Sequence, residues 1–240
     1  SVIECNLRAS RSFPFVSKVC NTNLIDIATK VMIDWPIPEI KLKPFNLEFV
    51  GVKAPQFSFT RLKGADPTLS VEMASTGEVG CLGADFEEAF LKAMIAVGFK
   101  LPVKNILLST GPSESKIDFL PAAKAIQLMN IKIFATQGTA DFLVKNNIKA
   151  EPVLWPSDNA SNSADQIIKE RKVDLVINIP KNYNKDEISN GYLIRRAAAD
   201  FGVPLITNIQ LAKRFIESIS KQSLDDLKCK TWNEYLEDSR

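Results

Sequence analysis

The sequence predicts an α/β protein whose C-terminal half contains a five-stranded parallel sheet with helices on both faces. From about residue 103 onward, short apolar runs alternate with longer stretches of helical periodicity, and this strand–helix unit occurs five times in series. The runs at residues 106–108, 131–134 and 175–178 are short and mostly apolar without alternation. Such runs are typical of strands that are buried on both faces of a parallel sheet.

The N-terminal 100 residues are less regular and predict two helices, two strands and a long loop. Residues 23–32 place their apolar side chains at helical spacing. Residues 85–97 predict a second helix, since acidic side chains fill its first turn and a glycine follows its end. Residues 49–52 and 57–60 are expected to be strands, whereas the prolines of residues 35–45 predict a loop or an extended connection.

In the second half, each strand–helix unit has the length of a buried strand followed by a helix. After the last unit, residues 225–240 are polar and predict a tail with one short helix. No internal repeat or low-complexity tract is apparent in the sequence. In chain order the predicted strands and helices are 105–108 and 119–129, 132–135 and 139–146, 152–154 and 164–171, 174–178 and 192–201, and 204–207 and 209–221.

Composition and charge are those of an ordinary globular protein and exclude several kinds of chemistry. The 240 residues are 45% hydrophobic and 24% charged, with a formal net charge of +2. This charge predicts no affinity for nucleic acid or anionic membranes, and no apolar run reaches the roughly 20 residues that span a bilayer. Four cysteines without metal-site spacing, and no recognisable signal peptide, predict a cytoplasmic protein with reduced thiols. The absence of histidine excludes histidine triads and histidine metal sites.

A short segment near the N-terminus has a pattern of polar side chains that suits a metal ion. In an extended segment alternate residues share a face, so Glu4, Asn6 and Arg8 are expected to project together. A carboxylate and an amide oxygen two residues apart suit a hard cation such as Mg²⁺ on a nucleotide phosphate. Arg8 and Arg11 could then hold phosphate or carboxylate oxygens. From the spacing alone, a solvated amphipathic edge strand remains the more common explanation.

Polar side chains also collect where the strands of the predicted parallel sheet end. Ligands of open parallel sheets bind at this edge, where loops meet helix N-termini. Thr136 and Thr139 lie at the start of a helix, whose free N–H groups favour an anion, and Gly138 permits close approach of the backbone. Trp155 offers a flat face for a base or an acyl chain. Helix capping and core packing stay open as explanations for each residue alone. The residues singled out at these strand ends are Lys116, Thr136, Thr139, Trp155, Asn178 and Lys181.

Several longer motifs resemble the large subunit of carbamoyl-phosphate synthases. The segment ECNLRASRSFPFVSK at residues 4–18 is similar to the end of the second ATP-grasp module of that family, and residues 53–59, 61–67 and 72–78 extend the similarity. The resemblance continues into the methylglyoxal-synthase-like allosteric domain that follows in the family. It implies three regions: the C-terminal part of a carbamate-phosphorylating ATP-grasp module, incomplete, at 1–102, a Rossmann-like, methylglyoxal-synthase-like domain at 103–222, and a polar tail at 223–240.

The resemblance implies an ATP-dependent ligase that phosphorylates carbamate and serves pyrimidine or arginine biosynthesis. Glu4 and Asn6 match metal ligands of the family, which uses ATP with Mg²⁺ or Mn²⁺, and Arg8 and Arg11 match catalytic residues that hold phosphate or carbamate. In the family the nucleotide-binding glycine-rich loop lies upstream of these motifs, so the chain alone is expected to be inactive and is not firmly expected to hold a cofactor. The implied partners are a glutaminase subunit or domain and the remaining large-subunit domains, and a homo-oligomer stays open.

In the second half, the same resemblance implies a site for an allosteric effector. Four of the six residues at the strand ends match positions that hold phosphate or carboxylate in the family: Lys116, Thr136, Thr139 and Asn178. Trp155 replaces a lysine common in bacterial forms and matches the animal-type pattern, and Lys181 stands where the N-acetyl-L-glutamate-regulated type has an asparagine. The glycine of the segment ATQGT at 135–139 is typical of nucleotide-regulated forms, which predicts UMP, IMP, UTP or phosphoribosyl pyrophosphate as the effector. Two alternatives stay open: an ammonia-dependent urea-cycle type that binds N-acetyl-L-glutamate, and an interaction module without a ligand. Methylglyoxal synthase activity is excluded, because that reaction relies on a histidine in its family.

Overall fold

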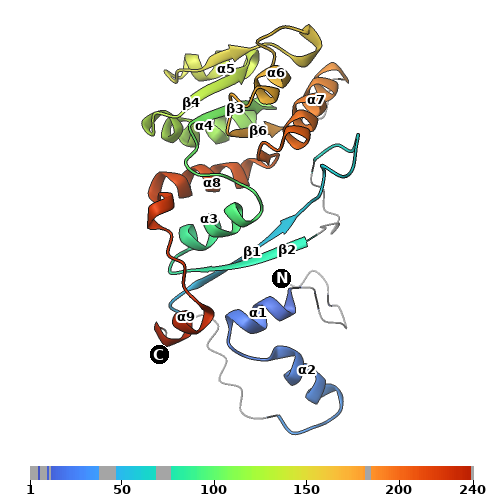
Figure 1. Cartoon of the computed structure of the whole chain (residues 1–240), viewed down its shortest axis with the longest axis vertical. Helices are drawn as coiled ribbons and strands as arrows, with labels where there is room; N and C mark the ends of the chain where they lie inside the picture. The colour runs from blue at the N-terminus through green and yellow to red at the C-terminus, as the bar shows by residue number, and fades with distance from the viewer. Residues whose placement is uncertain are drawn as a thin grey trace.

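The computed structural model (Figure 1) describes residues 5, 10, 12–37, 47–68, 77–181 and 185–238, without the side chains of residues 185–188 and 238. Most of the predicted loop at 35–45 and of the motif at 72–78 lies outside these ranges. The described part of the protein is elongated (Figure 1). The parallel sheet and its helices form one end, and the helices α1 (Phe13–Val19) and α2 (Leu24–Met32) lie at the other.

Five parallel strands form the sheet that the sequence predicts. Their order across the sheet is β5–β4–β3–β6–β7, so the strand that comes first in the chain lies at the centre. The chain adds two strands on one side of β3 and then crosses to its other side, which places a topological switch point between β3 and β6. The strands are β3 (Asn105–Thr110), β4 (Lys132–Thr136), β5 (Glu151–Val153), β6 (Leu175–Ile179) and β7 (Leu205–Ile206).

Helices cover both faces of this sheet and bury its side chains in two apolar layers. Ile106 and Leu108 of β3 pack with α4 and α8 on one face, whereas Leu107 packs with α6 and α7 on the other. The helix–sheet–helix layers confirm the predicted α/β class (Figure 1). No helix in the described ranges is long and apolar enough to cross a bilayer. The helices of this domain are α4 (Ser113–Leu128), α5 (Gln137–Lys145), α6 (Ala164–Lys169), α7 (Lys185–Phe201) and α8 (Ile209–Lys221).

Two of these helices begin one to two turns earlier than the sequence predicts. Helix α4 begins at Ser113 and not at residue 119, and α7 begins at Lys185 and not at residue 192. Both first turns are polar, so they lack the apolar periodicity on which the prediction depended. The extended backbone of Pro112 ends the preceding loop and allows α4 to begin directly after it.

An antiparallel ribbon and one helix connect the N-terminal half to the sheet domain. The ribbon consists of β1 (Val50–Gln56) and β2 (Gly77–Gly83), and helix α3 (Phe86–Ala96) lies between it and α8 (Figure 1). Leu91 and Met94 of α3 belong to the same apolar cluster as Phe215 and Ile216 of α8. The hydrophobic core therefore continues across the region around residue 102, where the resemblance places a domain boundary.

The helix predictions in the N-terminal half are confirmed, but one strand prediction is wrong. Asn23 caps α2 through Asp26 N, and Asp85 caps α3 through Glu88 N, as their positions before the helices suggest. Residues 57–60 are not a strand, because the chain turns after β1 and the rings of Phe57 and Phe59 stack on each other with centroids 5.7 Å apart. Helix α1 and strand β2 were not predicted, since neither has a clear apolar period.

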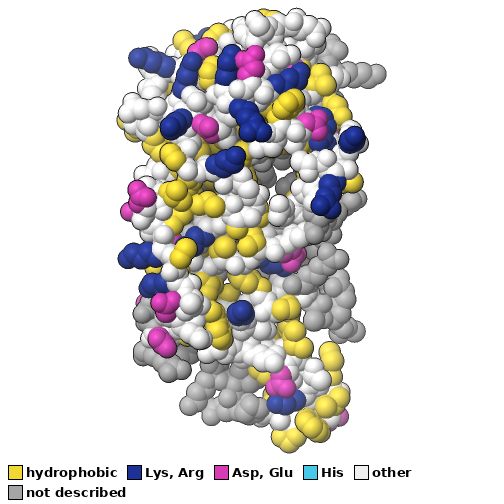
Figure 2. Space-filling model, in the orientation of Figure 1, with side chains coloured by type: hydrophobic (Ala, Val, Ile, Leu, Met, Phe, Trp, Pro, Cys, Tyr) yellow, Lys and Arg dark blue, Asp and Glu magenta, His cyan; other side chains and the backbone are white. Residues whose placement is uncertain are grey.

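Helix α2 exposes apolar side chains at the end of the molecule that is far from the parallel sheet (Figure 2). Val31 is 55% exposed, Met32 74% and the nearby Trp35 63%. Neither α1 nor α2 contains a buried residue. These two helices therefore contribute little to the core formed by the described residues.

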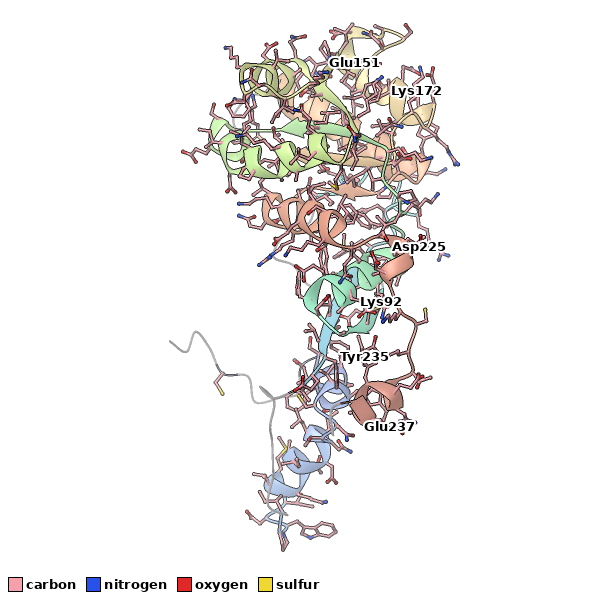
Figure 3. All side chains as sticks on the ribbon, turned by 90° about the vertical axis from the view of Figure 1, so that its left-hand side faces the viewer. Lys92, Glu151, Lys172, Asp225, Tyr235 and Glu237 are labelled. Atoms are coloured by element: carbon pink, nitrogen blue, oxygen red, sulfur yellow. The ribbon has the colours of Figure 1, made fainter. Side chains whose placement is uncertain are left out.

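The C-terminal segment packs against the N-terminal half. It contains the 3₁₀ helix η2 (Leu224–Asp226) and the helix α9 (Trp232–Asp238). Tyr235 is 4% exposed, and its hydroxyl accepts a hydrogen bond from Lys92 Nζ at 2.8 Å and donates to Leu82 O at 3.0 Å. Trp232 Nε1 donates to Lys18 O at 3.0 Å. Figure 3 shows Tyr235 on α9 beside Lys92 on α3. The short helix predicted in this segment is confirmed as α9, and it packs against the N-terminal half.

Candidate functional site

A cavity of about 550 Å³ opens at the carboxyl ends of β3, β4 and β6, at the switch point of the sheet. The first turns of α4 and α5 and part of α7 complete its wall. The structure brings together at this cavity all the strand-end residues that the sequence singles out. These lining residues are Lys116, Thr136, Thr139, Trp155, Asn178 and Lys181.

Buried hydroxyl groups form a connected cluster in the wall of the cavity. Thr139 Oγ1 accepts a hydrogen bond from Thr110 N at 3.2 Å and lies 3.4 Å from Thr110 Oγ1. Thr136 Oγ1 lies 3.4 Å from Ser109 Oγ and 3.5 Å from Thr139 Oγ1. Thr136 occupies the N-cap position of α5, but its side chain makes no capping hydrogen bond. Capping therefore does not explain Thr136, and the protein itself holds the cluster in position.

Lys116 reaches from the first turn of α4 to the start of α5. Its Nζ donates to Gly138 O at 2.8 Å. A Cβ atom at Gly138 would lie 3.5 Å from this Nζ, an ordinary contact, so no described protein atom requires glycine there. Gly111 is more constrained, because its N–H donates to Ile179 O at 3.1 Å and a Cβ would lie 2.7 Å from that oxygen. Gly111 thus permits the close approach of β3 and β6 beside the cavity.

Trp155 combines the two roles that the sequence left open, core packing and cavity lining. It packs against the apolar layer that contains Leu107, and it also lines the cavity. The loop that carries it is held by hydrogen bonds from Trp155 N to Asp158 Oδ2 at 2.9 Å and from Ser157 N to Asn190 Oδ1 at 3.0 Å. Asn190 is buried and supports this loop from α7. The loop that carries the indole is therefore held by contacts within the protein.

An ion pair that the sequence analysis did not identify closes one side of the cavity. The Arg195 side chain of α7 is 4% exposed, and its Nε and Nη2 donate to the two carboxylate oxygens of Asp66 at 2.7 and 2.6 Å. Its Nη1 donates to Asn178 Oδ1 at 2.7 Å. Burial acts to raise the pKa of Asp66, but the hydrogen bonds from Arg195 and Thr68 and the charge of Arg195 together outweigh this effect and lower that pKa.

The sequence contained weak signals for this pair. Asp66 belongs to the motif at 61–67, whose resemblance places it in the N-terminal half and not at the effector site. Arg195 and Arg196 directly precede the alanines at 197–199, within a helix whose neighbouring positions are small and apolar. Arginines on a buried helix face need partners, so this pattern indicates that acceptors from another segment lie close by.

The predicted metal ligands Glu4 and Asn6 and the predicted catalytic residues Arg8 and Arg11 lie outside the described residues. Next to them in the chain, Ser12 Oγ accepts a hydrogen bond from Lys53 Nζ at 3.3 Å. Lys53 also pairs with Glu78 of β2 at 2.6 Å. Elsewhere in the described ranges, no group of three or more acidic or thiol side chains is arranged to hold a metal ion.

Comparison with known proteins first identifies the class of the sheet domain. Residues 118–207 match the MGS-like domain family. This range runs from α4 to the end of β7 and contains five of the six predicted effector residues: Thr136, Thr139, Trp155, Asn178 and Lys181. The five-stranded parallel sheet agrees with this assignment. The protein therefore contains an MGS-like domain.

Over most of its length the chain is also similar to parts of much larger proteins. It is 50% identical over 224 residues to the multifunctional protein pyr1-3 of Dictyostelium discoideum, and 47% identical over 236 residues to the mitochondrial carbamoyl-phosphate synthase (ammonia) of Homo sapiens. It is 47% identical over 229 residues to the multifunctional protein URA2 of Saccharomyces cerevisiae. These matches cover 91%, 95% and 92% of this chain, but only 10%, 16% and 10% of the relatives. The chain is thus similar to the C-terminal region of carbamoyl-phosphate synthases and multifunctional pyr proteins and spans less than a fifth of their length, which confirms the resemblance.

Proposed function

We propose that the cavity binds an anionic effector, a nucleotide or a phosphoribosyl compound, and that the MGS-like domain thereby regulates carbamoyl phosphate synthesis in a larger protein. The convergence of hydroxyl groups, lysines and an indole on one cavity carries this proposal. Hydroxyl groups, lysine ammonium groups and the backbone at the start of α5 are donors that suit phosphate oxygens. The indole of Trp155 suits a base.

The size and charge of the cavity support an effector of this kind. Its volume of about 550 Å³ lies within the range of roughly 300–1,000 Å³ for small-molecule sites. Lys116, Lys181 and Arg195 bring cationic donor groups to the cavity, and Asp66 pairs with Arg195. Such donors suit anionic ligands, so UMP, IMP, UTP and phosphoribosyl pyrophosphate are the compounds to test first.

The catalytic contribution that we propose for the N-terminal half is part of the MgATP site of an ATP-grasp ligase. Glu4 and Asn6 would hold Mg²⁺ or Mn²⁺, and Arg8 and Arg11 would hold phosphate or carbamate. The metal would neutralise charge on the phosphates during phosphoryl transfer. The product would serve pyrimidine or arginine biosynthesis in the cytoplasm, with a glutaminase subunit or domain as partner. The 240-residue chain alone is expected to form no carbamoyl phosphate from ATP, and turnover in a sensitive assay would contradict this expectation.

The effector site is tested by ligand binding to the wild-type chain and to Lys116→Gln. We expect at least one of the four compounds to raise the melting temperature, because a ligand that binds the folded state stabilises it. Lys116→Gln removes a charged donor, so it is expected to raise the dissociation constant of the ligand about tenfold, equivalent to about 1.4 kcal/mol. Titration calorimetry measures this change. Lys124→Gln is the matched control, because Lys124 is an exposed lysine of the same helix outside the cavity lining. No change in melting temperature with any compound at millimolar concentration would contradict the proposal.

A second candidate effector is N-acetyl-L-glutamate, whose carboxylates can use the same donors. The similarity to a carbamoyl-phosphate synthase (ammonia) keeps this candidate in the panel. Trp155→Ala separates the two classes, because a base that stacks on the indole loses more affinity than an aliphatic dicarboxylate does. Binding of N-acetyl-L-glutamate alone would replace the nucleotide proposal.

A further inference from the structure

The loop after β1, residues 57–68, contributes to the cavity although it belongs to the N-terminal half. Asp66 and Thr68 line the cavity, and Thr68 Oγ1 donates to Asp66 Oδ1 at 2.9 Å. Helix α7 holds this loop, since Tyr192 OH donates to Gly64 O at 3.0 Å and two consecutive arginines bind other parts of it. The loop therefore links strand β1 directly to the wall of the effector cavity.

The two arginines hold the loop in different surroundings. Arg196 pairs with Asp200 at 2.6 Å on its own helix, and neither residue lines the cavity. Arg195 lines the cavity and binds the Asp66 carboxylate. A ligand in the cavity can therefore reach the contact made by Arg195 but not those made by Arg196. The loop carbonyls that accept from Arg196 are Phe59 O at 3.0 Å, Leu62 O at 3.1 Å and Ala65 O at 3.0 Å.

The guanidinium of Arg195 is placed to meet an anion. Among the described residues, it makes three hydrogen bonds, to Asp66 and Asn178, whereas a guanidinium has five N–H groups. Gly191, one turn earlier on α7, also lines the cavity, and a Cβ atom there would lie 3.0 Å from Arg195 Nη1. The absence of a side chain at Gly191 thus leaves this edge of the guanidinium open toward the cavity.

We infer that Arg195 is an anion-binding residue of the cavity, shared between Asp66 and a phosphate or carboxylate group of the ligand, and that ligand binding loosens residues 57–68. The inference rests on the proposed function. The ligand and Asp66 are both anions that bind one guanidinium, so each weakens the interaction of the other with Arg195. Because such coupling is reciprocal, the bond between Asp66 and Arg195 must also lower the affinity for the ligand. Occupancy of the cavity is thereby communicated to β1 and the N-terminal half.

Calorimetric titration of the 240-residue chain with UMP, IMP, UTP and phosphoribosyl pyrophosphate tests the shared arginine. Asp66→Asn removes the competing charge and is expected to tighten binding roughly three- to tenfold. Arg195→Gln is expected to weaken binding at least about tenfold, and Gly191→Ala, which displaces the guanidinium, to weaken it less. Asp200→Asn is the matched control, because it removes the charged partner of Arg196. The affinity of this variant for the ligand should equal that of the wild type.

Hydrogen exchange of the loop provides a readout that a purely structural role of the ion pair would not change. The amides of Arg61, Leu62 and Ala65 donate to carbonyl groups within the loop. In the wild type their exchange should accelerate several-fold when the ligand is added, whereas in Asp66→Asn it should be fast without ligand. Unchanged affinity in Asp66→Asn, or loop exchange that slows or stays constant with ligand, overturns the inference and leaves the effector site standing. Failure of the wild type to bind any of the compounds overturns both.

Discussion

The ion pair between Glu88 and Lys92 joins three parts of the molecule. Lys92 Nζ lies 2.7 Å from Glu88 Oε1, and the side chains are 16% and 8% exposed. Glu88 also accepts hydrogen bonds from Ala84 N at 2.6 Å and Lys228 N at 3.0 Å, and Lys92 reaches Tyr235. Burial acts to raise the pKa of Glu88, but the hydrogen bonds from Lys92 and the two backbone N–H groups outweigh it, so that pKa is lowered.

The substitution Lys92→Met tests how much this pair stabilises the fold. We expect the free energy of unfolding to fall by about 2–4 kcal/mol, because the Glu88 carboxylate stays buried without its counter-charge. Urea unfolding followed by circular dichroism measures this change. The control is Lys30→Met, which breaks the exposed pair with Asp26 on α2 and should cost less than about 0.5 kcal/mol. Equal losses in the two variants would show that the burial of the pair has no effect.

At the scale of elements, α9 depends on its contacts with the N-terminal half. A seven-residue helix is too short to be stable alone in water. Tyr235 supplies its main contact, with its ring 5.6 Å from that of Phe49 and its hydroxyl between Lys92 Nζ and Leu82 O. Figure 3 shows Tyr235 turned toward α3, while Glu237 of the same helix lies at its outer side.

The variant Tyr235→Ala is expected to undock α9. The loss of a buried aromatic side chain should lower the free energy of unfolding by about 3 kcal/mol. Hydrogen exchange of the amides at 232–238 should rise to the rate of an unfolded peptide, while that of the parallel sheet stays slow. Glu237→Ala serves as the control, since this side chain is exposed and should change stability by no more than about 0.5 kcal/mol. Retained protection in Tyr235→Ala would contradict the dependence of α9 on this contact.

At the scale of the whole molecule, one apolar cluster connects the ribbon side to the parallel sheet. Leu91 of α3, Phe215 of α8 and Ile106 of β3 are fully buried members of this cluster. Phe99, in the segment between the halves, also packs on Phe215 with ring centroids 5.2 Å apart. Removal of either half would expose this surface, so the two halves are expected to unfold together.

The variant Leu91→Ala tests this shared core. The cavity it leaves should lower the free energy of unfolding by about 2–5 kcal/mol. The measurement uses a background in which the other tryptophans are replaced by phenylalanine, so that fluorescence reports on Trp155 in the sheet domain. If the core is shared, Leu91→Ala should lower the midpoint of urea unfolding equally by Trp155 fluorescence and by circular dichroism. Leu128→Ala on α4 is the control, because Leu128 is 83% exposed. An unchanged Trp155 midpoint in Leu91→Ala would contradict the shared core.

The part of the site that could be predicted consists of residues at the ends of parallel strands. Thr136 and Asn178 lie at the carboxyl ends of β4 and β6, Trp155 comes shortly after β5, and the carboxyl ends of parallel strands meet at one edge. Asp66 could not be placed there by the same reasoning, because it comes from a loop far earlier in the chain whose path depends on Arg195 and Arg196 of α7. Such a path follows from tertiary contacts and has no local sequence pattern.

The sequence by itself determined the parallel sheet, the edge at which a ligand could bind and the chemistry available there. It could do so because buried strands and amphipathic helices have local periods, and because the topology of parallel strands fixes where their ends meet. Only the tertiary structure decided that the loop at 57–68 enters the cavity wall, that α9 docks through Tyr235, and that one core spans both halves. These features depend on contacts between residues far apart in the chain. A charge or an aromatic ring is stable in these buried positions only because a partner from a distant segment pairs with it or packs on it.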